Sequence, residues 1–253
     1  MIRVEELHKS FDGHPVLQGV SLSIGKGEVA ALIGGSGCGK SVLLKHLAGL
    51  MKPDRGRVFI DDTDMAALGG RKLQRVRARL GFLFQGGALF DSMTVFENVA
   101  FPLNEKSRLS RAVIERRVSE ELAHVGLKGS EHKYPSQISG GMIKRAALAR
   151  ALVTEPEIML FDEPTTGLDP VMGRSILKLI TSCHERLAFT GIIVTHMIPK
   201  VFEIVDRVVL LREGTVWANG SVEQIMNSGD PFVREFVSVQ ETTLDPGDSR
   251  DGE

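Results

Sequence analysis

The stretch that most restricts the fold of this chain is rich in glycine and joins an apolar run to an amphipathic one. Residues 34–41 read GGSGCGKS and match the pattern GxxxxGK[ST]. The run EVAALIG at 28–34 is typical of a buried strand, and SVLLKHLAGL at 41–50 has leucines at helical spacing. Glycines let backbone N–H groups converge on an anion, and the helix that follows adds the positive end of its dipole. The sequence therefore predicts a strand–loop–helix unit that binds phosphate.

A pair of adjacent acids supplies a second motif. IMLFDEP at 158–164 predicts a buried strand whose carboxyl end presents Asp162 and Glu163, and open parallel sheets bind ligands at that edge. In such a site Lys40 reaches the β- and γ-phosphates, while Ser41 and Asp162 hold Mg2+. Glu163 points differently and could polarise the attacking water as a general base. A glycine-rich turn or a solvated strand end would explain either motif alone, but their occurrence together favours nucleotide hydrolysis.

The rest of the pattern predicts an α/β fold with a helical insertion. Short strands are expected at 2–7, 20–24 and 56–62, and a helical pattern runs from about 89 to 154. Strand and helix then alternate through 157–163, 173–187, 191–196 and 199–206, followed by 207–214, 215–220 and a terminal helix at 230–239. Buried apolar strands that alternate with helices indicate a parallel sheet.

Composition excludes several other classes of protein. The net charge of −1 lacks the basic excess of a nucleic-acid binder, and the two cysteines, Cys38 and Cys183, have no metal-site spacing. No apolar run approaches the roughly 18 residues that span a bilayer, and residues 1–10 do not resemble a secretory signal. We therefore expect a cytoplasmic protein without a transmembrane segment. Residues 1–237 are expected to form one domain, and the acidic tail at 238–253 is expected to be disordered.

The segment SQISGGMIKRAALARAL at 136–152 resembles the signature of the ATP-binding cassette (ABC) family, whose LSGGQ appears here as ISGGM. Other family motifs follow in order over residues 1 to about 225: Gln85 matches the Q-loop glutamine, GLDP at 167–170 the D-loop, and His196 the switch histidine. The resemblance implies a P-loop ABC nucleotide-binding domain. Such a domain has an N-terminal antiparallel β part, a RecA-like parallel sheet core and an inserted α-helical subdomain, here at about 88–154.

The resemblance also implies the cofactors ATP and Mg2+ and a homodimer, in which the signature of one chain closes over the phosphate loop of the other. The implied catalytic residues are Glu163, His196, Gln85 and Lys40. The implied nucleotide contacts are Phe11, Gly34, Gly35, Ser36, Gly37, Cys38, Gly39, Lys40, Ser41, Val42, Ser139, Gly140, Gly141 and Asp169. The implied metal contacts are Ser41, Gln85 and Asp162. Phe11 occupies the place of an aromatic that stacks on adenine, with a core role as the alternative, and Met142 replaces the usual signature glutamine.

Residues 81–103, GFLFQGGALFDSMTVFENVAFPL, hold five of the twelve phenylalanines. In ABC transporters this segment helps to form the groove that receives a coupling helix of the permease. Its GALF and VFxNVAxPL patterns, the signature methionine and DPFVREF at 230–236 resemble the ATPase subunits of Mla/Mce-type phospholipid transport systems. The resemblance implies a peripheral subunit on the cytoplasmic face of the inner membrane. It also implies a polytopic permease, an Mce-domain lipid carrier and a STAS-domain regulator as partners.

Several alternatives stay open at this stage. The ATPase could serve another substrate, such as an amino acid or a metal, or it could be a soluble cassette that acts on a cytoplasmic scaffold. Phe90, Phe96 and Phe101 could pack the helical subdomain instead of lining a groove. The basic run RKLQRVRAR at 71–79 could attract anionic lipid headgroups or be a solvated helix face. Oxidation of Cys38 could block ATP binding, or Cys38 could be a small residue that the loop tolerates.

Overall fold

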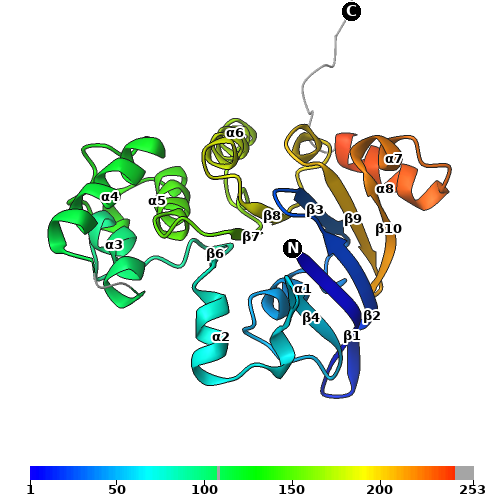
Figure 1. Ribbon diagram of the computed structural model, residues 1–253. Coiled ribbons are helices and arrows are strands. Elements are labelled where there is room, and N and C mark those ends of the chain that lie inside the picture. The colour runs from blue at the N-terminus through cyan, green and yellow to red at the C-terminus, as the bar shows by residue number, and fades with distance from the viewer. Residues whose placement is uncertain (107–108, 243–253) are drawn as a thin grey trace, which may run out of the picture.

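The computed structural model describes residues 1–106 and 109–242, and Figure 1 shows their arrangement around two sheets. The strands are β1 (Ile2–Phe11), β2 (His14–Ile24), β3 (Val29–Gly34), β4 (Arg55–Ile60), β5 (Thr63–Asp64), β6 (Leu80–Leu83), β7 (Ile158–Asp162), β8 (Thr190–Val194), β9 (Arg207–Arg212) and β10 (Thr215–Ser221). The helices are α1 (Lys40–Leu47), α2 (Gly70–Arg77), α3 (Val95–Lys106), α4 (Arg111–His124), α5 (Gly140–Leu152), α6 (Pro170–Leu187), α7 (Val222–Met226) and α8 (Pro231–Thr242), with short 3-10 turns η1 (Met65–Ala67), η2 (Pro135–Gln137) and η3 (Lys200–Glu203).

The N-terminal part is an antiparallel sheet with the strand order β2-β1-β4-β5. Strands β1 and β2 form a hairpin whose turn contains Asp12 and Gly13, both with positive φ. Ile2, Val4 and Leu7 bury one face of β1. Both strands are longer than the sequence predicted, because their polar ends near the turn pair through the backbone without an apolar alternation that would reveal them. The antiparallel β part is confirmed.

The second sheet has the order β10-β9-β3-β8-β7-β6. All its neighbouring pairs are parallel except β10 with β9, which form an antiparallel hairpin at one edge. Every residue of β3, β7 and β8 is buried, as the apolar runs predicted, because apolar side chains pack on both faces of the sheet. The carboxyl ends of β3, β8, β7 and β6 therefore lie next to one another along one edge.

Helices α3, α4 and α5 form a separate helical part with its own core, the green region of Figure 1. Val99, Val118, Leu122, Ala146 and Ala149 are fully or almost fully buried among these helices. The three helices lie inside the span 88–154 that the sequence predicts for the helical subdomain. The mixture of antiparallel sheet, parallel core and helical insertion agrees with the predicted fold class.

The structure differs from the prediction at two places near the C-terminus. The helix expected at 199–206 is only the 3-10 turn η3, whose bonds run from Phe202 N to Pro199 O and from Ile204 N to Val201 O. Its β-branched residues have a low propensity for the α-helix, and Val201 is fully buried in the turn that forms instead. Helix α8 continues to Thr242, beyond the domain boundary expected at 237. Residues 243–253 of the expected disordered tail lie outside the described residues.

An ion pair between an exposed arginine and a buried glutamate joins the helical part to the rest of the molecule. Arg186 on α6 places Nη2 at 2.8 Å from both carboxylate oxygens of Glu121 on α4, and Glu121 is only 4% exposed. Nearby, Arg145 of α5 donates through Nη2 to Ser175 Oγ of α6 at 2.9 Å. These contacts connect two units that otherwise have separate apolar cores.

We predict that Arg186→Met lowers the free energy of unfolding by about 3 kcal/mol, because it leaves the Glu121 carboxylate buried without its cation. Urea denaturation followed by circular dichroism measures the change. Arg174→Met is the matched control, since Arg174 lies exposed on the same helix. The double variant Glu121→Gln/Arg186→Met should recover most of the loss. A single variant as stable as the control would contradict the prediction.

Candidate functional site

The glycine-rich loop follows β3 and has two kinds of glycine. A Cβ at Gly34 would lie 2.3 Å from the Leu211 carbonyl oxygen, and one at Gly39 would lie 2.6 Å from Leu17 Cδ2. These two glycines, with φ of +149° and +103°, are required by close packing. At Gly35 and Gly37 a Cβ would meet nothing within 4 Å. The loop therefore curves around open space into which its backbone can face a ligand.

Lys40 is the cation of this loop. Its side chain is buried, and Nζ donates to the carbonyl oxygens of Gly34 and Gly35, each at 2.8 Å. The Cys38 sulfur lies 3.8 Å from the same nitrogen. Helix α1 begins at Lys40, so the positive end of its dipole faces the loop. Its first turn has no acidic residue that would offset this charge. The arrangement fits a polyphosphate, whose oxygens would replace the two carbonyls around the ammonium group.

The paired acids at the end of β7 have different partners. Asp162 accepts a hydrogen bond from Ser41 Oγ to Oδ1 at 2.9 Å, which brings together two residues predicted to hold a metal. Burial raises the pKa of the Asp162 carboxyl above its ordinary value, and the Ser41 hydrogen bond opposes this shift. Hydroxyl, carboxylate and amide oxygens suit Mg2+, which usually keeps several waters and needs few protein ligands. The donor set around Ser41 and Asp162 therefore fits this ion.

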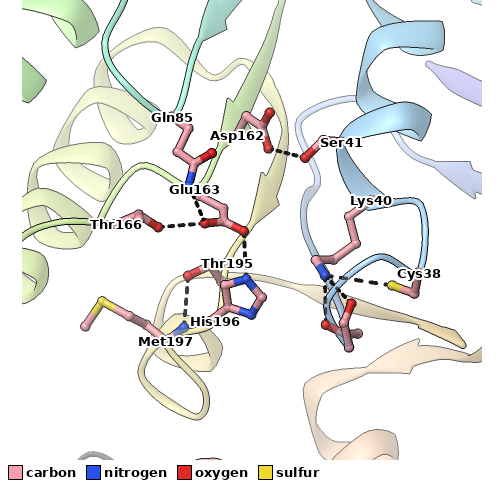
Figure 2. Close-up of polar contacts among 12 residues, drawn as sticks. Cys38, Lys40, Ser41, Gln85, Asp162, Glu163, Thr166, Thr195, His196 and Met197 are labelled. Carbon is pink, nitrogen blue, oxygen red and sulfur yellow. Dashed lines mark hydrogen bonds and ion pairs between the residues drawn. The ribbon is translucent and has the colours of Figure 1, made fainter.

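Glu163 lies at the centre of the hydrogen-bond network in Figure 2. Its Oε2 accepts from Gln85 Nε2 at 3.1 Å and from Thr166 Oγ1 at 2.7 Å, and Oε1 lies 2.7 Å from His196 Nε2. The Glu163 backbone N–H donates to the Val194 carbonyl at 3.0 Å, and its φ is +49°. The structure thus brings the predicted residues Gln85, Glu163 and His196 into contact. The sequence analysis missed Thr166, although a hydroxyl three residues after the acid was a usable signal.

Helix α5 holds the loop that carries Gln85. The buried ammonium of Lys144 donates to the Gln85 carbonyl oxygen, and burial lowers the pKa of Lys144. Arg150 donates to the carbonyl oxygens of Gly87 and Ala88, each at 2.7 Å. A Cβ at Gly87 would lie only 3.2 Å from Ile143 Cγ2, so the loop also packs closely on α5. Lys144 and Arg150 were not predicted, because they look like ordinary helix-surface cations in the sequence.

The signature residues and Asp169 contact helices α5 and α6. Ser139 is exposed and caps α5, accepting a hydrogen bond from Met142 N at 3.3 Å. Gly141 is required by packing, since a Cβ there would lie 2.4 Å from Met172 Cε. Asp169 caps α6 by accepting from Val171 N and Met172 N. Among the described residues, no hydrogen bond joins Ser139 or Asp169 to the glycine-rich loop.

The remaining residues predicted to contact the nucleotide lie in the loop, in α1, at the end of β1 and at the start of α5. Phe11 is half-exposed at the end of β1, with Lys9 Nζ 5.5 Å from its ring centroid. Ser36 lies exposed in the loop, Val42 is partly buried in α1, and Gly140 is exposed at the start of α5. Their roles stay predictions, and so do those of Ser139, Gly141 and Asp169.

The phenylalanine-rich stretch divides between two environments. Phe82, Phe84, Phe90 and Phe101 line a groove of about 490 Å³ with Pro102 and Arg150 at its walls. Phe82 stacks on Phe84 at 4.2 Å between ring centroids, and Phe90 contacts Phe101 at 4.9 Å. Phe84 and Phe90 are 38% and 42% exposed. Phe96 instead packs against the core of the helical part. The cluster is therefore divided between a surface groove and that core, and the permease contact stays a prediction.

The basic run forms helix α2 and the short segment after it. Arg79 pairs with Asp61 and Glu157, while Arg77 Nη2 donates to the Gly49 carbonyl. Arg71, Lys72 and Arg75 form an exposed face of α2. The run is therefore partly a set of internal contacts and partly a solvated helix face, and the lipid contact stays a prediction.

We predict that Asp162→Asn raises the thermal unfolding midpoint of the nucleotide-free protein at pH 7 by a few degrees. A carboxyl whose pKa is raised by folding destabilises the folded state when it is ionised, and the penalty is complete above the folded pKa. Asparagine keeps the oxygen that accepts from Ser41 but carries no charge. The advantage should shrink as the pH falls through the raised folded pKa, and it should vanish below the ordinary pKa of about 4, where both states are protonated. Scanning calorimetry at several pH values tests this, with the exposed Asp91→Asn as control; equal midpoints for both variants at pH 7 would contradict it.

Comparison with known proteins identifies the family to which the chain belongs. The family model described as ABC transporter matches residues 17–166. The chain is 44% identical over 237 residues to the probable ribonucleotide transport ATP-binding protein mkl of Mycobacterium tuberculosis, covering 94% of this chain and 66% of that protein. It is 39% identical over 222 residues to the intermembrane phospholipid transport system ATP-binding protein MlaF of Escherichia coli, covering 88% and 82%.

A solved structure agrees with these relatives. An ATP-binding cassette determined as a dimer, in a post-hydrolysis state bound to ADP and Pi, matches with a TM-score of 0.81 and 33% identity over 88% of this chain and 99% of that one. The chain spans about two thirds of the length of the mycobacterial relative. Within the described residues, no helix has the length and apolar character needed to cross a membrane. The chain belongs to the ABC transporter family and is an ATP-binding, ATP-hydrolysing cassette.

Proposed function

We propose that this chain is the ATPase subunit of a transporter that moves phospholipids between the inner membrane and the rest of the envelope. One segment that contacts two sites supports this proposal most directly. Gln85 in this segment contacts Glu163. Phe84 and Phe90, on either side of Gln85, line an apolar groove. An ATPase needs the first site, and a separate permease needs the second. The likeness to MlaF supports phospholipid as the cargo.

In this proposal the phosphates of ATP lie in the glycine-rich loop. Gly35 and Gly37 leave room for them, and the ammonium of Lys40 exchanges two carbonyl partners for phosphate oxygens. Phe11 stacks on the adenine, since its ring is half-exposed. Ser36, Cys38 and Val42 complete the loop around the nucleotide.

Ser41, Asp162 and Gln85 would hold Mg2+. When bound, this ion neutralises charge on the β- and γ-phosphates and holds them in line for transfer. The hydrogen bond from Ser41 to Asp162 keeps both oxygens directed at the same place before nucleotide arrives. The raised pKa of Asp162 indicates that its buried carboxylate gains from a nearby positive charge.

Glu163 is the general base in this proposal. Gln85 and Thr166 fix one carboxylate oxygen, and His196 contacts the other, so the side chain is held in one orientation. It accepts a proton from the attacking water, while Lys40 and His196 stabilise the charge that develops on the γ-phosphate. His196 must carry its proton on Nε2 to donate to Glu163, and the same N–H can turn to a phosphate oxygen.

Two copies of the chain complete the site. Ser139 and Gly140 lie exposed at the start of α5, where the helix dipole favours an anion, and Gly141 follows them. ATP binding closes the dimer so that each signature, with Asp169 beside it, faces the loop of its partner. Closure drives a permease at the cytoplasmic face of the inner membrane. An Mce-domain lipid carrier and a STAS-domain regulator are the further partners we expect.

We predict that Glu163→Gln binds ATP with nearly unchanged affinity, hydrolyses it at least 100-fold more slowly and accumulates an ATP-bound dimer, because an amide cannot accept the proton of water. Phosphate release and size-exclusion chromatography with ATP measure the two effects. The exposed Glu185→Gln is the control. Lys40→Ala should instead lose nucleotide binding. Normal turnover by Glu163→Gln would refute the role of this carboxylate.

Ribonucleotide is a second candidate cargo, because mkl bears that name at 44% identity. The test uses the transporter purified from native membranes through a tag on this chain and placed in proteoliposomes. We expect ATP-dependent transfer of a fluorescent phospholipid and no uptake of labelled ribonucleotide. Phe84→Asp and Phe90→Asp should lower recovery of the permease about tenfold or more, since a charge in the groove loses an apolar anchor. Met226→Asp on the exposed surface of α7 is the control. Ribonucleotide uptake without lipid transfer would favour the second candidate.

A further inference from the structure

A second cavity lies behind the phosphate loop, away from the groove and the catalytic residues. It has a volume of about 190 Å³ and is enclosed by the end of α1, the turn that follows it, β4 and α2. Met51, Val58, Met65 and Leu73 form apolar walls, and His46 and Arg77 add two polar side chains. None of these residues belongs to the predicted nucleotide site.

Two buried polar atoms in this cavity have no partner. Across residues 1–106 and 109–242, the buried side-chain nitrogens without a hydrogen bond are His46 Nε2 and Arg77 Nε, and both residues line this one space. His46 is only 1% exposed. An unsatisfied buried polar atom costs about 1–3 kcal/mol. Two of them in a single cavity are explained most simply by a molecule that binds there.

The chemistry of the two atoms is complementary. His46 Nδ1 lies 2.8 Å from the Val42 carbonyl oxygen, which can only accept, so Nδ1 carries a proton. Burial is the main influence on His46 and lowers the pKa of its ring; the Val42 hydrogen bond and the nearby Lys52 backbone, which does not meet hydrogen-bond geometry, raise that pKa by less. The ring is therefore neutral at pH 7. Its Nε2 then presents a lone pair, and Arg77 Nε presents an N–H. The Nη2 of Arg77 is already bound to the Gly49 carbonyl, which fixes the guanidinium in place.

These properties define a class of ligand. Hydroxyl groups donate to an acceptor and accept from a donor, whereas ethers only accept. The cavity is several times larger than the roughly 30 Å³ occupied by one water, and its walls are mostly apolar. We propose that this cavity is a regulatory site for a small hydroxylated molecule, whose hydroxyl groups bind His46 Nε2 and Arg77 Nε while its hydrocarbon part packs on Met65 and Leu73.

The position of the cavity explains how an occupant would affect ATP hydrolysis. His46 lies in the last turn of α1, the helix that begins with Lys40 and Ser41. Arg77 ends α2, which leads directly into β6 and then to Gln85. A molecule bound to both side chains fixes the phosphate-loop helix relative to the segment that carries Gln85. Binding therefore changes the rate at which the site forms its productive geometry.

The test uses the full chain and two isomeric probes of the same composition, 1,4-butanediol and 1,2-dimethoxyethane. Imidazole and guanidinium nitrogen signals of His46 and Arg77 are followed by NMR during titration with each probe, and the ATPase rate is measured alongside. We expect the diol to shift both signals and to bind about tenfold more tightly than the diether, because only the diol can donate to His46. We also expect saturating diol to change the ATPase rate.

Variants separate a binding role from a structural one. His46→Leu removes the acceptor, and we expect it to lower diol affinity about tenfold without lowering the unfolding midpoint, since it removes an unsatisfied atom. Arg77→Lys keeps the charge but removes the Nε–H, and the exposed Arg116→Lys on α4 is its control. Equal binding of the two isomers, or unchanged His46 and Arg77 signals, would overturn the site. Diol binding at an unchanged ATPase rate would overturn its regulatory role. Both results are independent of whether phospholipid is the cargo.

Discussion

The parallel ladder β3-β8-β7-β6 is the constraint on which the rest of the structure depends. Backbone pairs such as Leu32 with Val194 and Asp162 with Val194 fix the register of neighbouring strands. Because the strands run in the same direction, the segments that follow them emerge side by side. The glycine-rich loop, the paired acids, the switch histidine and Gln85 all follow such strands. A shift of one residue in β7 would turn the side chains of its last residues to the opposite face of the sheet and separate Asp162 from Ser41.

Residues of the candidate site can be predicted from the sequence where the signal is local. The glycine-rich loop is recognisable because strand, glycines and helix are contiguous, and Asp162 and Glu163 are recognisable because they end an apolar run. The contact of Glu163 with Gln85 and His196 is different. These residues are far apart in the chain, and no spacing predicts their meeting, so only the order of the family motifs suggested it.

The features that the sequence did not predict depend on the direction of single side chains. Glu121 and Arg186 are 65 positions apart and look like surface charges on two amphipathic helices, yet Glu121 is buried and accepts from Arg186. Lys144 and Arg150 were overlooked for the same reason. His46 looked like one polar residue among leucines, and its unpaired nitrogen becomes visible only when α1, α2 and the turn after α1 are packed together. Periodicity gives the face of a helix but not the partner of a side chain.

Helix α5 contacts three parts of the molecule: the signature, the loop that carries Gln85 and the phenylalanine groove. Its first residues are the signature, and Ser139 at its cap is exposed. One turn on, Lys144 binds the carbonyl of Gln85, whose side chain contacts Glu163. Near its end, Arg150 lines the phenylalanine groove and binds the carbonyls of Gly87 and Ala88.

Because one helix makes all these contacts, it cannot shift at the groove or at the signature without moving the loop that carries Gln85. The hydrogen bond from Gln85 to Glu163 then lengthens or shortens with that shift. The ion pair of Glu121 with Arg186 limits the movement from the other side, since it anchors α4 of the helical part to α6. The geometry of the Glu163 carboxylate is therefore linked to the groove and to the signature through contiguous hydrogen bonds, from Arg150 and Lys144 of α5 to the loop of Gln85 and from Gln85 to Glu163.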